Sequence, residues 1–406
     1  MSTDESTQAP APDAVGCRAS RRCPAWLELG FRPFFSGALL FGVIAIVLWT
    51  SALASAAAPP AISAGGSMWH AHEMVFGYGL AVVAGFLLTA VPNWTGLPTV
   101  HGRGLGGLFG LWCATRVAFA SAWPSPLAAF TTALFNLALF VIAARPIVRA
   151  RQWRQLGILS KLALLGLADA LFFLGQFGAL DNGARFGVYL GLYVLVALAL
   201  TLLRRLIPFF TERGVGYAVS LRNSVWLDRA SLVTMLAFAV LATFTEARLF
   251  TALVALAASS VHLARLRGWY THGIWRRPLL WSLHVAYALF ALAFAVHALA
   301  LYYLAPPSAA VHCFALGGIG MLTVSMMLRV SLGHTGRDVH RPPAGTSIIF
   351  AWLMGAFALR QASLWVWPAA YSALVVAAAL AWCGALMLVA QLLVPMLAAP
   401  RAQESR

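Results

Sequence analysis

The sequence predicts an all-α, polytopic membrane protein, and three observations support this fold class. Of its 406 residues, 61% are hydrophobic and only 10% are charged, whereas charged residues make up about a quarter of an ordinary soluble domain. The mean hydropathy is +0.81. Apolar runs of about 20 residues, the length that a helix needs to cross a bilayer, recur along nearly the whole chain. Together these features exclude a soluble globular domain.

Twelve apolar runs are long enough to be membrane-spanning helices. The loop between the seventh and the eighth is nearly absent, since only one residue separates Glu246 from Arg248. We expect a single integral-membrane domain over residues 31–399. The expected helices cover residues 35–57, 68–91, 104–123, 126–144, 158–179, 184–208, 228–246, 248–266, 278–301, 308–330, 346–366 and 370–397.

The net charge of +16 indicates orientation in the membrane and not nucleic-acid binding. When the 28 Lys and Arg residues are sorted by the twelve runs, all but four fall on one side. Basic residues are concentrated in the cytoplasmic loops of membrane proteins, so both termini are expected to be cytoplasmic. The exceptions are Arg116, Arg185, Arg248 and Arg360.

The two ends of the chain are expected to be tails. Residues 1–30 are rich in Ala, Pro, Ser and Thr and carry mixed charge, which is typical of a disordered segment. Residues 400–406 are expected to form a second cytoplasmic tail. The first apolar run begins only after Phe31 and is too long for the hydrophobic region of a cleavable signal peptide, so we expect it to be an uncleaved anchor.

Familiar catalytic motifs do not explain the function. The sequence contains no Walker loop and no dinucleotide fingerprint, and its five cysteines show neither a CxxC pair nor the spacing of a zinc site. No fixed-period repeat is sustained, although twelve spans leave room for an inverted pair of halves. Ionisable groups within the apolar runs therefore become the functional candidates, because such groups are costly in a bilayer.

The ten histidines divide by position. Three lie in loops and are expected to be solvated, and His262, beside Arg265 and Arg267, is expected at the level of the lipid headgroups. Each of the other six could be a packed histidine or a metal ligand, but six in one membrane chain favour a metal or cofactor site. The six are His70, His72, His284, His297, His312 and His334.

Depth in the membrane predicts two layers of histidines. His70, His72 and His312 fall near the external ends of their helices. His334 lies 22 residues after His312, which is roughly 33 Å along a continuous helix at 1.5 Å per residue, so one metal cannot bind both. His284 lies near the cytoplasmic end of its helix, at a depth close to that of His334. We expect one site in each layer.

The spacing of His70 and His72 leaves two possibilities open. On a regular helix they differ by about 200° in azimuth and face opposite ways. If residues 67–71 are irregular, both imidazoles could converge on one ion. Imidazole suits copper and haem iron equally well, and Glu73 could orient an imidazole or carry a proton.

Other buried charges have alternative interpretations. Asp169 lies in an apolar span and needs a partner, either as a proton carrier or in a hydrogen bond with a neighbouring helix. Arg329 and Arg337 flank His334, and Arg32 precedes the first helix. These arginines could pair with haem propionates or could anchor the chain at the headgroups.

Several sequence blocks resemble the NnrS family. They occur in the order found in that family and span residues 31–337. The blocks are "FRPFF", "WHAHEMVFGYGLAVVAGFLLTAVPNWTG", "RRLIPFFT", "PLLWSLHVAY" and "MLRVSLGHTGR".

The resemblance implies a bacterial inner-membrane protein that binds haem b and copper and is associated with denitrification and with tolerance of nitric oxide. By motif it implies that His70, His72, His284, His312 and His334 bind these cofactors, whereas His297 matches no block. We rank binding and protection first. A redox enzyme acting on nitric oxide and a transporter of metal or small molecules are the alternatives.

Overall fold

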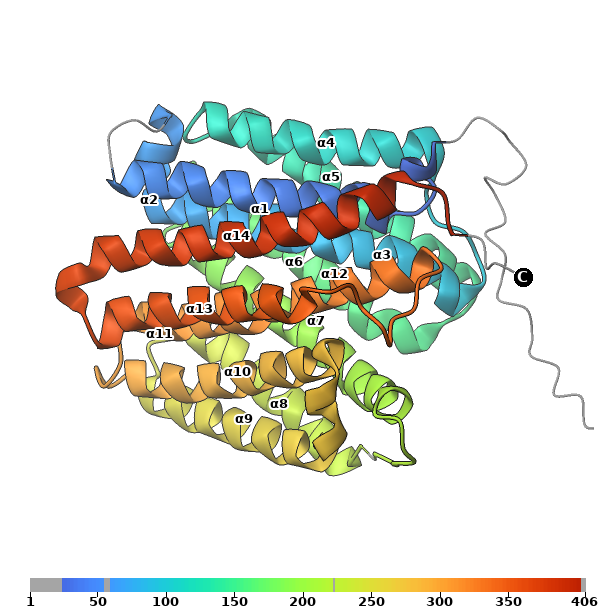
Figure 1. Cartoon of the computed structure of the whole chain (residues 1–406). Helices are drawn as coiled ribbons and strands as arrows, with labels where there is room; N and C mark the ends of the chain where they lie inside the picture. The colour runs from blue at the N-terminus through green and yellow to red at the C-terminus, as the bar shows by residue number, and fades with distance from the viewer. Residues whose placement is uncertain (1–23, 55–58, 222, 403–406) are drawn as a thin grey trace, which may run out of the picture.

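The computed structural model describes residues 24–54, 59–221 and 223–402. In these residues the regular structure is helical, and eleven helical segments are long and apolar enough to cross a membrane. The helices run side by side, with both described ends of the chain at one end of the bundle (Figure 1). The predicted all-α, polytopic fold is confirmed.

Two of the membrane-spanning segments consist of an α-helix, a π-helix and a second α-helix in direct succession. Each of the remaining segments contains one α-helix, which in two of them follows a short 3-10 turn. In chain order the elements are α1 (Phe31–Ala54), α2 (Pro60–His72), π-helix η2 (Glu73–Gly79), α3 (Leu80–Thr95), α4 (Gly102–Ser121), α5 (Pro126–Arg149), α6 (Leu156–Gln176), α7 (Gly183–Gly214), α8 (Val225–Phe244), α9 (Arg248–Trp269), α10 (Pro278–Ala300), α11 (Pro307–His312), π-helix η5 (Cys313–Gly320), α12 (Met321–His334), α13 (Thr346–Trp365) and α14 (Tyr371–Ala398). Short 3-10 turns are η1 (Ala25–Leu27), η3 (Trp153–Gln155), η4 (His272–Arg276) and η6 (Pro368–Ala370).

Helix α4 corresponds to the predicted span over residues 104–123, and it is not among the eleven membrane-spanning segments counted above. It forms a helix of 20 residues, which is about 30 Å long, and it runs the length of the bundle (Figure 1). Its composition is less apolar than that of the other spans because it includes Arg103 and Arg116. Arg116 is buried against Glu73 of η2, so the low hydropathy of α4 partly reflects an internal ion pair.

The start of the second span differs from the prediction. The sequence predicted a helix from residue 68, whereas α2 begins at Pro60. Within α2, Gly66 has a φ of 51° and a ψ of −128°, a backbone conformation that favours glycine. The chain kinks there and is helical again from residue 67. The span ends at Gly96, whose φ of 70° is typical of a helix C-cap.

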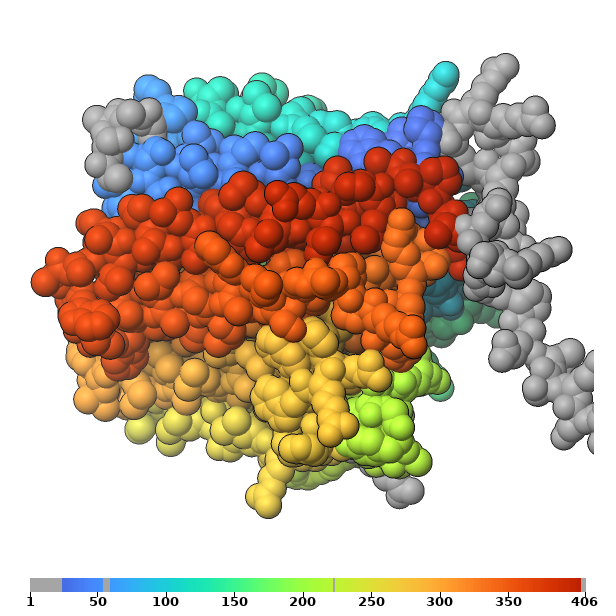
Figure 2. All heavy atoms as spheres, in the orientation of Figure 1, coloured from blue at the N-terminus to red at the C-terminus, as the bar shows by residue number. Residues whose placement is uncertain are grey.

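The first and last helices meet on one face of the bundle. Figure 2 shows them in blue and red as neighbouring bands, and the Trp382 indole donates to the Gly42 carbonyl between them. Arg32 donates to the carbonyls of Leu397 and Ala399, as basic groups often do at helix C-termini. This contact explains the burial of Arg32 without a haem propionate.

The predicted tails are described only in part. Residues 1–23 and 403–406 lie outside the described residues. Residues 24–30, which we expected in the tail, include η1 and pack against the bundle, since a Cβ added to Gly30 would clash with Leu88. At the other end, the Ala402 N–H donates to the Thr335 carbonyl.

The outer faces of the bundle are apolar. Phe130 of α5 is 67% exposed and Leu232 of α8 is 54% exposed, and large apolar side chains in this number are not left in water. They face lipid. In contrast, α7 lies in the interior, where it contacts η2, η5 and α10.

Candidate functional site

His70 and His72 point in opposite directions. Residues 67–72 are helical, so the two side chains lie on different faces of α2, and the alternative of an irregular segment is wrong. The His70 ring stacks on Trp49 of α1, with ring centroids 4.3 Å apart. His72 instead contacts α6. One ion cannot be held by both.

His72 is the centre of a buried polar cluster, which we call the carboxylate cluster. Its Nδ1 lies 3.0 Å from a Glu73 oxygen and its Nε2 lies 2.9 Å from an Asp169 oxygen. Arg116 of α4 donates to the same Glu73 oxygen. The Asn136 amide of α5 donates to the second Asp169 oxygen at 2.8 Å. Thus Asp169 has the partners that its position in the bilayer requires.

The carboxylate cluster is electrically balanced when His72 is protonated. A carboxylate only accepts hydrogen bonds, so with both carboxylates ionised each His72 nitrogen carries a hydrogen. The imidazolium and Arg116 then neutralise Glu73 and Asp169. His72, Glu73 and Asp169 are all fully buried, where an unpaired charge would cost several kcal/mol. Both ring nitrogens are occupied, which leaves none for a metal.

Aromatic rings shield this cluster from water. The rings of Phe76, Phe119, Phe172 and Phe173 lie 4.4–5.4 Å from the His72 ring, measured between centroids. One Glu73 oxygen is buried and has no hydrogen-bond partner. The cluster is therefore enclosed by aromatic rings and keeps one carboxylate oxygen free to accept a further hydrogen bond.

His70 belongs to a second cluster, which we call the histidine pair. His312 of α11 and Arg360 of α13 are both within electrostatic range of His70, and Arg360 is also a neighbour of His312. The His312 Nδ1 donates to the Ser308 carbonyl at 2.7 Å. The His70 Nδ1 is buried and has no partner. The predicted outer layer is thus split between the histidine pair and the carboxylate cluster.

The two clusters occupy matching places in two similar spans. His72 directly precedes the π-helix η2, and His312 directly precedes η5. In each span a glycine follows the histidine by five residues, and a Thr-Gly pair stands at the end of the last helix. Both spans run in the same direction through the bundle. The two spans thus share a helix, π-helix and helix pattern with a histidine at its first junction.

The predicted inner layer is not brought together by the structure. The His284 Nδ1 donates to the Leu280 carbonyl at 3.0 Å, and its Nε2 lies 3.4 Å from the Trp269 carbonyl at the end of α9. The His334 ring lies 5.7 Å from the ring of Phe31 in α1. The two imidazoles therefore face different helices. His297, outside both layers, packs against Phe238.

The histidines differ in how well they are placed to bind haem iron or copper. Among the described residues, no group of three or more His, Cys, Asp and Glu side chains could hold a metal. A metal-binding histidine usually donates its other ring N–H to a carbonyl or carboxylate. His312 makes this contact through Nδ1, and His70 has a buried nitrogen without a partner. His284 also makes it through Nδ1, but its Nε2 is already in contact with the Trp269 carbonyl, which a metal would have to displace. His72 has no free nitrogen.

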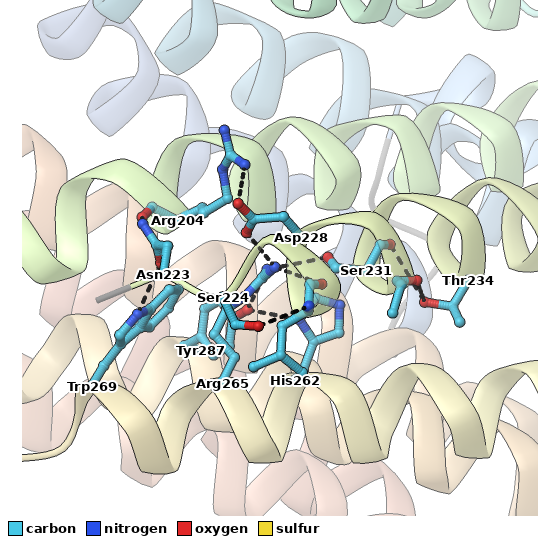
Figure 3. Close-up of polar contacts among 12 residues, drawn as sticks. Arg204, Asn223, Ser224, Asp228, Ser231, Thr234, His262, Arg265, Trp269 and Tyr287 are labelled. Atoms are coloured by element: carbon cyan, nitrogen blue, oxygen red, sulfur yellow. Dashed lines mark hydrogen bonds and ion pairs between the residues drawn. The ribbon is translucent and has the colours of Figure 1, made fainter. Parts of the chain in front are cut away.

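A third polar cluster, in α7–α10, was missed by the sequence analysis. Asp228 lies between Arg204 and Arg265, with N–O distances of 2.6 and 2.8 Å (Figure 3). Arg265 also donates to the Tyr287 hydroxyl, which is 2.7 Å from the His262 Nδ1. His262 is fully buried among the helices, and its predicted depth at the level of the headgroups stays a prediction. The i, i+3 spacing of His262 and Arg265 could have revealed a shared polar face.

Of the two arginines that flank His334, Arg329 has protein partners. Arg329 is only 8% exposed, donates to the Leu279 carbonyl and lies 4.1 Å above the centre of the Phe210 ring. Its Nε has no partner, and neither has one terminal nitrogen of Arg337. Arg329 lines a small cleft at the end of the bundle together with Arg277 and His340.

These features define a polytopic helical membrane protein with ionisable clusters buried among its helices. The family described as NnrS protein matches residues 25–401, nearly the whole described chain. The chain belongs to the NnrS family. Among curated proteins, none matches it.

Proposed function

We propose that this protein binds haem and copper in the bacterial inner membrane and acts in the response to nitric oxide. The observation that carries the proposal is the histidine pair. His70 and His312 come from two separate spans. His70 keeps a buried nitrogen without a hydrogen-bond partner, and the His312 ring is oriented through Nδ1 by the Ser308 carbonyl. Buried polar atoms are normally hydrogen-bonded. A histidine nitrogen without a partner inside an apolar bundle therefore indicates a role other than packing.

Copper and haem would use different histidines. His70 and His312 would hold copper, since imidazole suits this metal, and their two spans would fix the separation of the rings. His284 would hold haem iron through Nε2 once its long contact with the Trp269 carbonyl is given up, with its Nδ1 oriented by the Leu280 carbonyl. A bound haem or copper ion would supply a site for nitric oxide, which is small and neutral and partitions into the bilayer.

A redox enzyme acting on nitric oxide is the second candidate, and the carboxylate cluster favours it. Reduction chemistry needs protons, and His72, Glu73 and Asp169 form a buried store of one exchangeable proton. The store is two residues from His70 along α2. His72 would then hold or deliver a proton and would not bind a metal.

Purified protein tests the cofactor assignment. We expect a b-type haem absorption band and bound copper in the wild type. His284→Ala should lose haem, and His70→Ala and His312→Ala should each lose copper while keeping haem. His101→Ala, at an exposed position before α4, is the matched control and should keep both. Colourless, copper-free wild type from cells supplied with both metals would contradict the proposal.

Growth under nitric oxide tests the role in the cell. Cells that lack the protein should be more sensitive, and full-length His312→Ala that is inserted in the membrane should not restore tolerance. Equal protection by a variant that has lost its metal would contradict a metal-based role. Repeated consumption of nitric oxide by reduced, purified protein would favour the enzyme over simple binding, and loss of that turnover in His72→Gln would identify the carboxylate cluster as its proton source.

A further inference from the structure

The small cleft that Arg329 lines continues into a larger hollow beside the loop between α12 and α13. The larger hollow has a volume of about 320 Å³, and the walls of both include Arg277, Pro278, His340 and Pro342. Pockets that hold small molecules have volumes of about 300–1,000 Å³. We call the two hollows together the arginine cleft. It has room for a small polar group.

The arginine cleft is lined by three arginines that have no carboxylate partner. They are Arg276, Arg277 and Arg329, and none of the described residues in the walls is Asp or Glu. None of the three takes part in an ion pair among residues 24–54, 59–221 and 223–402. The described walls therefore carry three positive charges and no negative one.

Arg329 is the buried member of the three. It is 8% exposed, and one terminal nitrogen donates to the Leu279 carbonyl at 2.9 Å. Its Nε is buried and has no hydrogen-bond partner. Buried polar atoms are normally hydrogen-bonded, so an orphan N–H donor in the wall of an open cleft indicates an acceptor that comes from outside the chain.

Two long helices begin at the arginine cleft. Pro278 at the start of α10 and Thr346 at the start of α13 both line it. Neither helix has an acidic residue in its first turn, and neither N-cap residue makes a side-chain cap. Each helix N-terminus adds the equivalent of about half a positive charge and offers backbone N–H groups of the kind that bind phosphate. The two sides are joined by Arg277, which donates to the His340 carbonyl at 3.0 Å.

The mouth of the arginine cleft borders an apolar outer surface. Ile348 of α13 lines the cleft and is 57% exposed, and Trp352 is exposed one turn further along the same helix. Trp275, next to Arg276, is also exposed. Tryptophan is enriched where the membrane meets water. The cleft therefore lies where the headgroup of a lipid meets its acyl chains.

We propose that the arginine cleft binds the headgroup phosphate of an anionic phospholipid from the leaflet at this end of the bundle. The guanidinium groups of Arg277 and Arg329 match phosphate oxygens in pairs, and the start of α13 supplies N–H donors. The acyl chains lie along the outer face of α13. A headgroup with a cationic choline fits less well, because the three arginines repel it. The site needs no metal, and it goes beyond the proposed function.

Lipid titration of the purified full-length protein in a neutral, phosphate-free detergent tests the site. Phosphatidylglycerol, phosphatidylcholine and inorganic phosphate are added separately, and bound lipid is counted by native mass spectrometry alongside thermal unfolding. Phosphatidylglycerol should bind saturably, raise the unfolding temperature and bind at least about fivefold more tightly than phosphatidylcholine. Equal binding of the two lipids would overturn the proposal. Inorganic phosphate that binds as tightly as phosphatidylglycerol would overturn the assignment to a lipid.

Two arginine variants separate the cleft from the overall charge of this end of the molecule. Arg277→Gln should weaken phosphatidylglycerol binding about fivefold or more. Arg267→Gln is the matched control, since Arg267 is exposed in the last turn of α9 and does not line the cleft. It should leave the affinity unchanged. Equal weakening in both variants would overturn the proposal.

Ser347 provides a second matched pair, which does not depend on removing an arginine. It is exposed in the first turn of α13 and lines the cleft. Ser347→Asp suits a helix N-terminus, so the protein should fold, but its carboxylate occupies the cleft and should abolish the preference for phosphatidylglycerol. Ser347→Asn should keep it. The same preference in both variants would overturn the proposal.

Haem and copper are measured in every sample. Weaker lipid binding in Arg277→Gln at unchanged haem content supports a lipid site. Loss of haem from the same variant would assign the arginines to a haem propionate and would overturn the proposal. Failure of the metal assignment leaves the lipid test intact, because the cleft shares no residue with the histidine pair.

Discussion

Two histidines only two residues apart illustrate how the environment of a side chain decides its chemistry. His72 has a carboxylate at each ring nitrogen and is the buried partner of Asp169. His70, on the opposite face of α2, stacks on Trp49 and keeps a free nitrogen. The first is suited to hold a proton and the second to hold a ligand. Both residues are histidines, so residue type alone does not distinguish these two roles.

Asp169→Asn tests the balance of charges at this scale. The change removes one of the two carboxylates and leaves the His72 cation and Arg116 with a single counter-charge. Breaking a buried pair typically costs about 3–5 kcal/mol, and we expect a loss of stability of that order in thermal or denaturant unfolding in detergent. Asp181→Asn, at an exposed position before α7, is the control and should change stability by about 0.5 kcal/mol or less. Equal stability of the two variants would contradict the ion-pair assignment.

At the scale of elements, the two π-helices bring polar groups into an apolar bundle. A π-helix is usually a single wide turn at a functional site, and here η2 and η5 each follow a histidine. In η2 the Trp112 indole donates to the Gly77 carbonyl. The glycine also makes room for the ion pair, because a Cβ on Gly77 would lie 2.8 Å from the Arg116 guanidinium and 2.6 Å from Phe41.

Gly77→Ala should therefore disturb the Arg116–Glu73 pair. Overpacking of a buried position costs about 1–3 kcal/mol, and we expect a lower unfolding temperature. Gly107→Ala in α4 meets no atom within 4 Å, so it should be neutral or stabilising by up to about 1 kcal/mol. A Gly77→Ala protein as stable as Gly107→Ala would show that the pair can shift without cost.

At the scale of the whole molecule, the helices alternate in direction and both described ends of the chain lie together. Arg32 at the start of α1 binds the end of α14, so the chain crosses the bundle an even number of times. Eleven apolar spans plus α4 satisfy this condition. The buried Arg116 is the reason that composition alone undercounts the spans.

The side of the membrane can be measured with reporter fusions. The distribution of basic residues predicts a cytoplasmic C-terminus. A reporter fused after Arg406 should be active in the cytoplasm, and one inserted after Asp181, between α6 and α7, should be active on the opposite side. The same compartment for both sites would contradict the even number of crossings. Exchanged compartments would contradict the positive-inside assignment alone.

The sequence predicted the candidate residues better than their grouping. It identified His70, His312 and Asp169 as groups that need a partner or ligand, because ionisable side chains are costly in a bilayer. It placed His70 with His72, since depth along a helix can be counted from the sequence. Which neighbour each face meets depends on helix rotation and packing, and these come from contacts between distant segments. The cluster of Asp228 with Arg204 and Arg265 was missed for this reason.

The sequence by itself determined the class, the approximate spans and the family, because hydrophobic length and local motifs are properties of contiguous residues. Only the tertiary structure decided that Glu73 pairs with Arg116, that Asp169 pairs with His72, and that the described walls of the arginine cleft hold no carboxylate. Each of these contacts, made or missing, depends on helices that are far apart in the chain. The energy of a buried charge depends on which groups surround it in space, and this information is absent from spacing along a single helix.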